Sequence, residues 1–276
     1  MRSWLAGTRL AGNWLSAAGM VLLLLGATGG VRAQDMLDQV DLSSPAFTQA
    51  EMTRGDIEAA LAKLPAGAVL DLSNKSLNGL DLSLLDLRRT NLQSARLNKA
   101  KLAGANLSGV NFDQGWALGA DASGANFSTA SLFGTQFVGA IADGADFSNA
   151  RFAGDFSKAS LTGARFDGAD LSADMKNQSM GLMRGVFKSA NLSGASFVKA
   201  NLSRVVLEFS SLVDADLSGA RLNGSELGGA NFAGANVDGT NFEDADVTSA
   251  RIGALKNAAK AINLDKVKNG DRAYRN

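Results

Sequence analysis

Aspartate is the residue type in this sequence that could most readily do chemistry, because paired carboxylates act as general acids and bases or as metal ligands. Most aspartates of the repeat share one setting, directly before a residue that recurs every five positions; eight examples are Asp71, Asp81, Asp86, Asp121, Asp146, Asp170, Asp216 and Asp246. A placement that follows a repeat indicates a structural role for these carboxylates and not an active site.

The other side chains typical of enzyme sites are missing. The 276 residues contain no histidine and no cysteine. A Ser-His-Asp triad is therefore impossible, and neither a disulfide framework nor a thiolate metal site can form. The sequence also has no phosphate-binding loop and no zincin motif. We expect no enzyme, no cofactor, no metal site and no small-molecule substrate.

A five-residue period organises the part of the chain that carries these aspartates. From Leu72 a large apolar residue returns every five positions as far as Phe152, with alanine as the only substitute. One residue is then missing before Phe156, and after Leu171 an interval of eleven leads to Leu182, from which the period runs to Ile252. Of these 36 sites, 30 are Leu or Phe.

Neither a helix nor a flat strand buries every fifth residue on one side. Five helical steps advance by about 500°, and on a strand odd spacings alternate between faces. A chain that turns a corner every five residues buries each centre, together with the small residue two positions before it. The Asp, Asn, Ser and Gly that fill the other positions suit turns and solvent.

Blocks such as Ala105-Asn106-Leu107-Ser108-Gly109 and Ala190-Asn191-Leu192-Ser193-Gly194 state the repeat clearly. This pattern resembles the pentapeptide-repeat family. The resemblance implies an all-β fold, a right-handed quadrilateral β-helix with twenty residues per coil. Twenty-residue spacing then predicts one inner column of Phe127, Phe147, Phe166 and Phe187, and a neighbouring column of Phe137, Phe156 and Phe197.

The sequence predicts four segments. They are a signal peptide (1–33), an N-terminal segment with a capping helix (34–69), the β-helix (70–252), and a C-terminal helical cap with a polar tail (253–276). Thr53 and Asp56 resemble a capping box that starts the first cap. Leu255, Ala258, Ala259 and Ile262 recur at helical spacing in the second. We expect Lys266–Asn276 to be loose.

The first 33 residues have the pattern of a secretion signal. Arg2 and Arg9 precede the apolar stretch Met20–Leu25, and Val31-Arg32-Ala33 fits a cleavage site before Gln34. The sequence thus predicts a periplasmic or secreted protein. The alternative is an uncleaved leader that anchors the chain in the membrane, the only membrane association expected.

Charge gives little support for a nucleic-acid partner. The mature chain would carry 24 basic and 27 acidic residues, a net charge of −3. A basic cluster of Arg88, Arg89, Arg96, Lys99 and Lys101 could contact phosphates, but acids interleave with it. Asp81, Lys101 and Asp121 should stack with alternating sign, so a solvated face is the preferred interpretation and we expect no nucleic acid.

Two departures from the repeat mark candidate functional segments. Trp116, Leu118, Phe133, Val138 and Ile141 occupy outward positions that are normally polar, and such an apolar patch is typical of an interface. Alternatively, a loop covers the patch or Trp116 turns inward. At Ser172–Arg184 the frame slips and Met175, Met180 and Met183 gather, which indicates either a functional loop or filler.

The leading interpretation is a non-catalytic structural or interaction module, exported, that binds a protein partner or itself as a homodimer through the faces of the β-helix. The second comes from the family resemblance: some members mimic duplex DNA and inhibit gyrase. The export signal and the near-neutral charge disfavour it.

Overall fold

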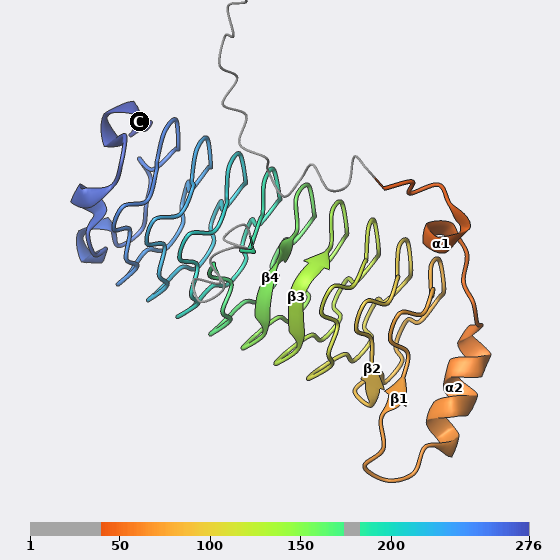
Figure 1. The fold of residues 1–276 in the computed structure, drawn as a ribbon. Helices are drawn as coiled ribbons and strands as arrows, with labels where there is room; N and C mark the ends of the chain where they lie inside the picture. Colours follow the sequence, from red (N-terminus) through yellow and green to blue (C-terminus); the bar gives the residue numbers. More distant parts are fainter. Residues whose placement is uncertain (1–39, 174–182, 276) are drawn as a thin grey trace, which may run out of the picture. The chain divides into compact units, whose positions relative to one another are not determined.

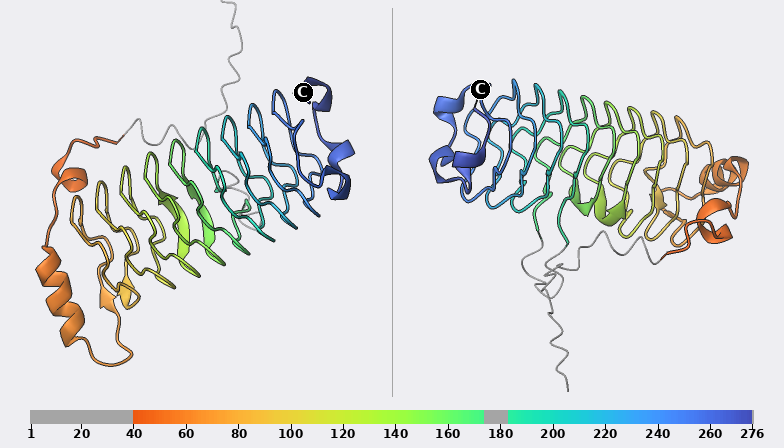
Figure 2. Two further views of the ribbon diagram at one scale, coloured as in Figure 1. Left: turned by 180° about the vertical axis from the view of Figure 1, so that it is seen from behind. Right: turned by 90° about the horizontal axis from the view of Figure 1, so that it is seen from above.

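The computed structural model of the protein describes residues 40–173 and 183–275, all within one compact unit of residues 33–276. The chain winds into stacked coils that advance from the N-terminal helices α1 (Pro45–Thr48) and α2 (Arg54–Lys63) to the C-terminal cap (Figures 1 and 2). Within the described ranges, no helix is both long enough and apolar enough to cross a membrane.

Parallel backbone bridges join each coil to the next at five-residue steps. Asp81 pairs with Lys101, which pairs with Asp121, and the same twenty-residue spacing recurs on all four sides. Short strands mark two places on one side: β1 (Leu70–Asp71) pairs with β2 (Thr90–Asn91), and β3 (Ser131–Gln136) pairs with β4 (Arg151–Asp155). The stack thus has the four-sided geometry that the resemblance to the pentapeptide-repeat family implies.

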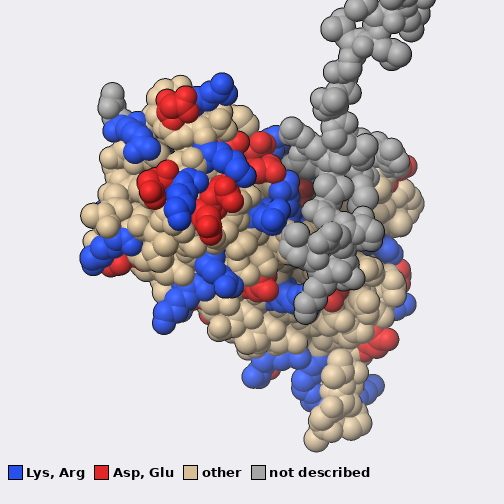
Figure 3. All heavy atoms as spheres, turned by 60° about the vertical axis from the view of Figure 1, so that its left-hand side comes forward, with Lys and Arg blue, Asp and Glu red and all other residues tan. Residues whose placement is uncertain are grey.

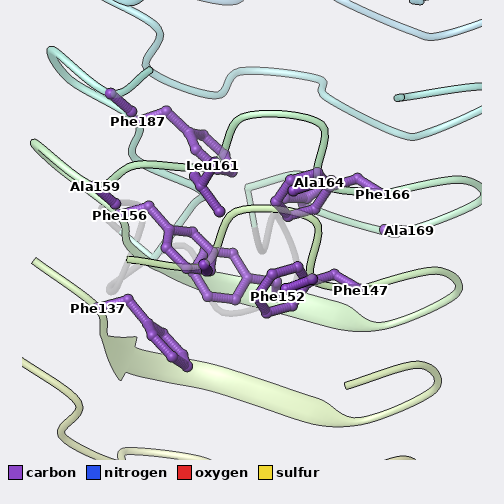
Figure 4. Close-up of a cluster of buried hydrophobic side chains, with 14 of the residues drawn as sticks. Phe137, Phe147, Phe152, Phe156, Ala159, Leu161, Ala164, Phe166, Ala169 and Phe187 are labelled. Carbon is purple, nitrogen blue, oxygen red and sulfur yellow. The ribbon is translucent and has the colours of Figure 1, made fainter. Parts of the chain in front are cut away.

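The core is a set of apolar columns inside the coils, built from the centres and from small residues two positions earlier. Phe147 and Phe166 stack with ring centroids 4.9 Å apart and planes 6° from parallel. Each also meets Phe156 of the neighbouring column edge-on (Figure 4). Offset stacks and edge-to-face contacts are the favoured arrangements of aromatic rings, so the interior combines burial with specific ring geometry.

The prediction for the upper part of these columns is wrong. Phe197 stacks on Phe166 at 4.9 Å, and Phe187 stacks on Phe156 at 5.3 Å, so the two rings exchange the places predicted for them. The reason is the register: Asp155 pairs with Val186, 31 positions later, where the normal coil has twenty. The interval after Leu171 is therefore an eleven-residue insertion within one coil. Leu182, predicted as a centre, lies outside the described residues.

Helix α2 starts at the predicted capping box. The Thr53 side chain accepts from the Asp56 amide, and the Asp56 carboxylate accepts from the Thr53 amide at 2.8 Å. The helix buries Ile57 against the core of the first coils. Arg54 Nη1 donates to the Asp81 and Ser83 carbonyls, which fixes the helix to the first coil.

The C-terminal cap is a last coil with six residues per side. Lys256, Ile262, Lys268 and Tyr274 pair with the coil before them. Between them lie three short 3-10 helices: η3 (Ala258–Lys260), η4 (Leu264–Lys266) and η5 (Gly270–Arg272). The helical spacing of 254–262 thus produces one short helical turn, not a continuous helix.

The expectation of a loose tail after Lys266 is also wrong, because Lys268 and Tyr274 donate to the Ala245 and Ala250 carbonyls at 2.8 Å. Within the cap, the Lys260, Lys266 and Arg272 amides donate to the Asn257, Asn263 and Asn269 carbonyls. Three carbonyls at the end of the stack are thus satisfied by the chain itself, which reduces the unpaired backbone at this strand edge.

Candidate interaction face

The repeat aspartates hold the coil turns together. All eight accept the backbone amide two residues further on, as Asp121 does from Ser123 at 3.1 Å: Asp71, Asp81, Asp86, Asp121, Asp146, Asp170, Asp216 and Asp246. The hydrogen bonds from Ser73 hold the pKa of Asp71 below its ordinary value. Among the described residues, no group of three or more acidic side chains is placed to hold a metal ion.

The basic cluster is largely taken up by contacts within the chain. Arg88 pairs with Asp86 at 2.6 Å, and Arg89 donates to the Ala68 and Pro65 carbonyls that follow α2. Lys101 lies between Asp81 and Asp121 in one row of bridges, as predicted. Figure 3 shows basic and acidic side chains interspersed over the surface near the C-terminal end. The described contacts therefore give Arg88 and Arg89 a structural role.

One side of the stack breaks the polar pattern. We call it the Trp116 face and define it by its outward row: Ser76, Arg96, Trp116, Gln136, Asp155, Val186, Val206, Glu226 and Asp246. The segment Ser43–Glu51, called the arm below, crosses the first coils on this face. Ala50 forms an antiparallel bridge with Leu77, and the Glu51 amide donates to the Ser76 carbonyl at 2.8 Å.

Trp116 is covered by the arm. Its ring meets the Phe47 ring of α1 edge-on, with centroids 5.0 Å apart. The alternative in which a local segment folds over the predicted patch therefore holds at this residue. This contact could not be predicted, because no residue pattern in the arm indicates which coil it meets.

The other four predicted residues lie beyond the arm. Leu118 and Val138 follow one another in adjacent coils of the Trp116 face, where the Gly119 amide donates to the Val138 carbonyl at 3.0 Å. Both are half-buried, as are most outward positions of the stack. Phe133 lies on the preceding side, with Arg151 Cζ 5.7 Å from its ring centroid. Ile141, on the following side, is 47% exposed.

The insertion also emerges at the Trp116 face. Arg184, at its end, pairs with Glu226 at 2.9 Å and reaches past Val206, an outward residue that is only 7% exposed. Met183 Cε lies 3.2 Å from where a Cβ on Gly134 would stand. Met175 and Met180 lie outside the described residues. The insertion is visible in the sequence as a frame slip, but the face that it joins is not.

Asp155 is a further unusual group on this face. It is 8% exposed, and burial raises the pKa of its carboxyl above the ordinary value, opposed by the hydrogen bonds from Ser157. The Ser157 amide donates to Asp155 Oδ1 at 2.7 Å. The missing residue between Phe152 and Phe156 was the available signal, since it shortens the corner on which Asp155 sits.

A family model and solved structures place this architecture among known proteins. A family model described as pentapeptide repeats matches eight copies over residues 71–102, 119–173 and 186–248, more than half of the chain. No curated protein matches.

Among solved structures, two trypsin-treated variants of QnrB1, a plasmid-mediated fluoroquinolone resistance protein, align with TM-scores of 0.54. They are 21% and 22% identical to this chain; each alignment covers 74% of it, and 92% and 91% of the respective QnrB1 chains. HetL, involved in heterocyst differentiation regulation in Nostoc sp. strain PCC 7120, is 25% identical over 73% of this chain and 97% of its own, with a TM-score of 0.35.

Proteins with this repeat fold as right-handed quadrilateral β-helices, which confirms the fold expected from the sequence. They are generally non-catalytic. With eight repeat copies, four-sided twenty-residue coils and the aspartate-held turns, the chain belongs to the pentapeptide-repeat family.

Proposed function

We propose that the protein is an exported, non-catalytic interaction module that binds a protein partner, or a second copy of itself, through the Trp116 face. The observation that carries the proposal is the change of side-chain type on this face. Where the outward Val198 of another side lies between Asp167 and Ser218 of the adjacent coils, this face presents Leu118 and Val138 next to one another, with Ile141 exposed on the next side. Exposed apolar residues that adjoin one another are typical of protein interfaces.

The repeat aspartates support a non-catalytic role, because their carboxylates are engaged in turns, and the family is generally non-catalytic. A DNA mimic requires continuous rows of negative charge, whereas Lys101 interrupts Asp81 and Asp121 in the described coils. No observation on the described residues favours that second function.

Export is the part of the proposal that rests on residues 1–33 alone, outside the described residues. Their charged start, apolar centre and small-x-small site support cleavage before Gln34. Mass spectrometry of the mature N-terminus tests it: a protein that begins at Gln34 and is released from the periplasm supports export. An intact N-terminus in the membrane fraction would instead indicate an anchored protein.

The interface is tested by photo-crosslinking in the native host. A photoreactive amino acid at Val138 should give a discrete adduct, with the partner or with a second copy, identified by mass. The matched control is Val198, an equally placed outward valine on another side. Equal labelling at both positions, or none at Val138, would contradict the use of this face.

A further inference from the structure

The arm shows which chemistry the Trp116 face recognises in a peptide. Its backbone is held by side-chain amides from two consecutive coils: Asn78 Nδ2 donates to the Ala46 carbonyl at 3.0 Å and to the Gln49 carbonyl at 3.2 Å, and Asn98 Nδ2 donates to the Phe47 carbonyl at 3.5 Å. These amides satisfy carbonyls of α1 and of its C-cap residue, while Ala50 and Glu51 pair with the first coil as an extended strand does.

Two kinds of arm side chain are held as well. Phe47 packs on Trp116, and Arg96 Cζ lies 6.0 Å from the Phe47 ring centroid. Glu51 pairs with Lys75 at 3.2 Å and approaches Arg96 at 3.8 Å. The face therefore binds both an apolar side chain of the arm, Phe47, and a carboxylate, Glu51. Arg96 contacts both of them.

The same combination continues beyond the arm. Leu118 and Val138 form the apolar part, Lys99 lies at the corner one coil before Leu118, and Lys158 at the corner one coil after Val138. Arg151 lies on the preceding side. All three cations are exposed, and within the described ranges none of them forms an ion pair with a carboxylate.

The carboxylates near this strip are already bound. Asp113 accepts from the Phe133 amide at 2.8 Å and from Ser131 Oγ at 2.6 Å. Asp143 accepts from the Thr162 amide and from Ser160 Oγ. Turn hydrogen bonds fix these two carboxylates in place while they keep their charge, so Lys99, Lys158 and Arg151 are the long charged side chains that can reach a ligand over Leu118 and Val138.

We propose that an extended segment of a partner protein, with acidic residues next to apolar ones, binds over Leu118 and Val138, between Lys99 and Lys158, alongside the arm. The inference rests on the proposed function and names the partner's chemistry. The contact is continuous with the arm's own, and its charge is complementary to the three free cations.

A peptide fits this strip better than the other polyanions. Leu118 and Val138 occupy adjacent coils, a strip about 10 Å long at strand spacing, which suits one or two apolar side chains and not a lipid surface. A nucleic-acid backbone would place phosphates against these apolar residues, with no gain from covering them. A segment with both apolar and acidic residues can cover Leu118 and Val138 and also pair with the cations.

The probe is a fluorescein-labelled peptide, Asp-Leu-Asp-Phe-Asp-Leu, titrated with the chain from Gln34 and followed by fluorescence anisotropy. Binding should weaken with salt, and by at least about tenfold, equivalent to 1.4 kcal/mol, in L118S/V138S and in K99E/K158E. Lys199→Glu is the matched control, because Lys199 occupies an equivalent corner on another side. It should leave the affinity within about twofold, roughly 0.4 kcal/mol.

Several results would overturn the proposal. Equal binding of a Lys-Leu-Lys-Phe-Lys-Leu peptide would remove the charge argument, and unchanged binding in both double variants would remove the site. Binding that appears only after deletion of residues 34–39 would show that the chain's own acidic segment is the occupant. Crosslinking at Val138 without any peptide binding would overturn this inference and leave the proposed function standing.

Discussion

The ring of Phe209 lies over Gly229 of the next coil, with its Cδ1 only 2.6 Å from where a Cβ on that glycine would stand. Both residues have a positive φ, 58° and 67°. The same relationship recurs at seven further corners: Leu84 over Gly104, Lys99 over Gly119, Gln114 over Gly134, Asn149 over Gly168, Lys199 over Gly219, Arg204 over Gly224 and Asp214 over Gly234.

Gly229→Ala should therefore destabilise the protein for two separate reasons. A left-handed conformation costs an alanine about 1–2 kcal/mol, and the clash with Phe209 adds about 1–3 kcal/mol. Gly194 is the matched control, because it has the same φ of +67° and nothing within 4 Å of a Cβ. Urea unfolding followed by circular dichroism should show a larger loss for Gly229→Ala, and in a Phe209→Ala background the two losses should become equal. A persistent difference would show that Phe209 is not the obstacle.

The interior residues were predictable from the sequence, because their burial depends only on residue type and on the five-residue spacing. Each inward residue occupies the same local environment, so a Leu or Phe every fifth position suffices to locate it, and the deletion before Phe156 is visible as a phase shift. The insertion was ambiguous. A gap of eleven fits either a new phase from Leu182 or a loop within one coil, and only the bridge between Asp155 and Val186 decides between them.

The candidate site was predictable in part. The outward apolar residues were visible as violations of the polar pattern, but the arm's contact with Trp116 joins segments about 70 positions apart without any shared motif. The six-residue cap had a signal that sequence analysis missed: Asn257, Asn263 and Asn269 recur at intervals of six, each with a φ near 60°. Asparagine tolerates that conformation better than most residues do.

Asn263 is expected to stabilise the cap through its backbone conformation and through its side chain, whose Nδ2 donates to Asn241 Oδ1 at 3.0 Å. Asn263→Ala loses both contributions, and it should lower the free energy of unfolding by about 1–2 kcal/mol. Asn263→Gly keeps the left-handed turn and should cost about 0.5–1 kcal/mol. Thermal unfolding of the two variants checks the order; an alanine variant as stable as the glycine variant would contradict the role of the turn.

Phe166 should contribute more to stability than any exposed ring. It stacks between Phe147 and Phe197, with centroids 4.9 Å away on either side. Phe166→Ala is expected to cost about 3–5 kcal/mol, since the column cannot collapse around the cavity. Phe209→Ala, at a position 64% exposed, should change stability by about 0.5 kcal/mol. Urea midpoints of the two variants measure the difference, and comparable losses would be inconsistent with a stacked interior.

Asp155 should make the fold sensitive to pH in a direction set by its burial. Burial raises the pKa of its carboxyl in the folded state above the value of about 3.8 in the unfolded chain, so ionisation of Asp155 opposes folding as pH rises through the folded-state pKa. Asp155→Asn keeps an oxygen that can accept from the Ser157 amide. The variant should melt at a higher temperature than the parent at pH 7, and the difference should disappear below about pH 3.8. An unchanged or lower melting temperature at pH 7 would contradict it.

Deletion of residues 174–184 tests whether the eleven extra residues are an insertion in an otherwise regular coil. The joined sequence Leu171-Ser172-Ala173-Gly185-Val186-Phe187 restores five-residue spacing between the two centres and twenty-residue spacing between Phe156 and Phe187. The protein should keep its β-rich circular dichroism and cooperative melting. It should lose about 1–2 kcal/mol, because Ala173 must serve as a corner residue and the Arg184–Glu226 pair is removed. Ala173→Gly in the shortened chain should recover about 1 kcal/mol, since glycine adopts the corner conformation freely. If Leu182 were a core centre, the deletion would instead remove part of the interior and abolish cooperative unfolding.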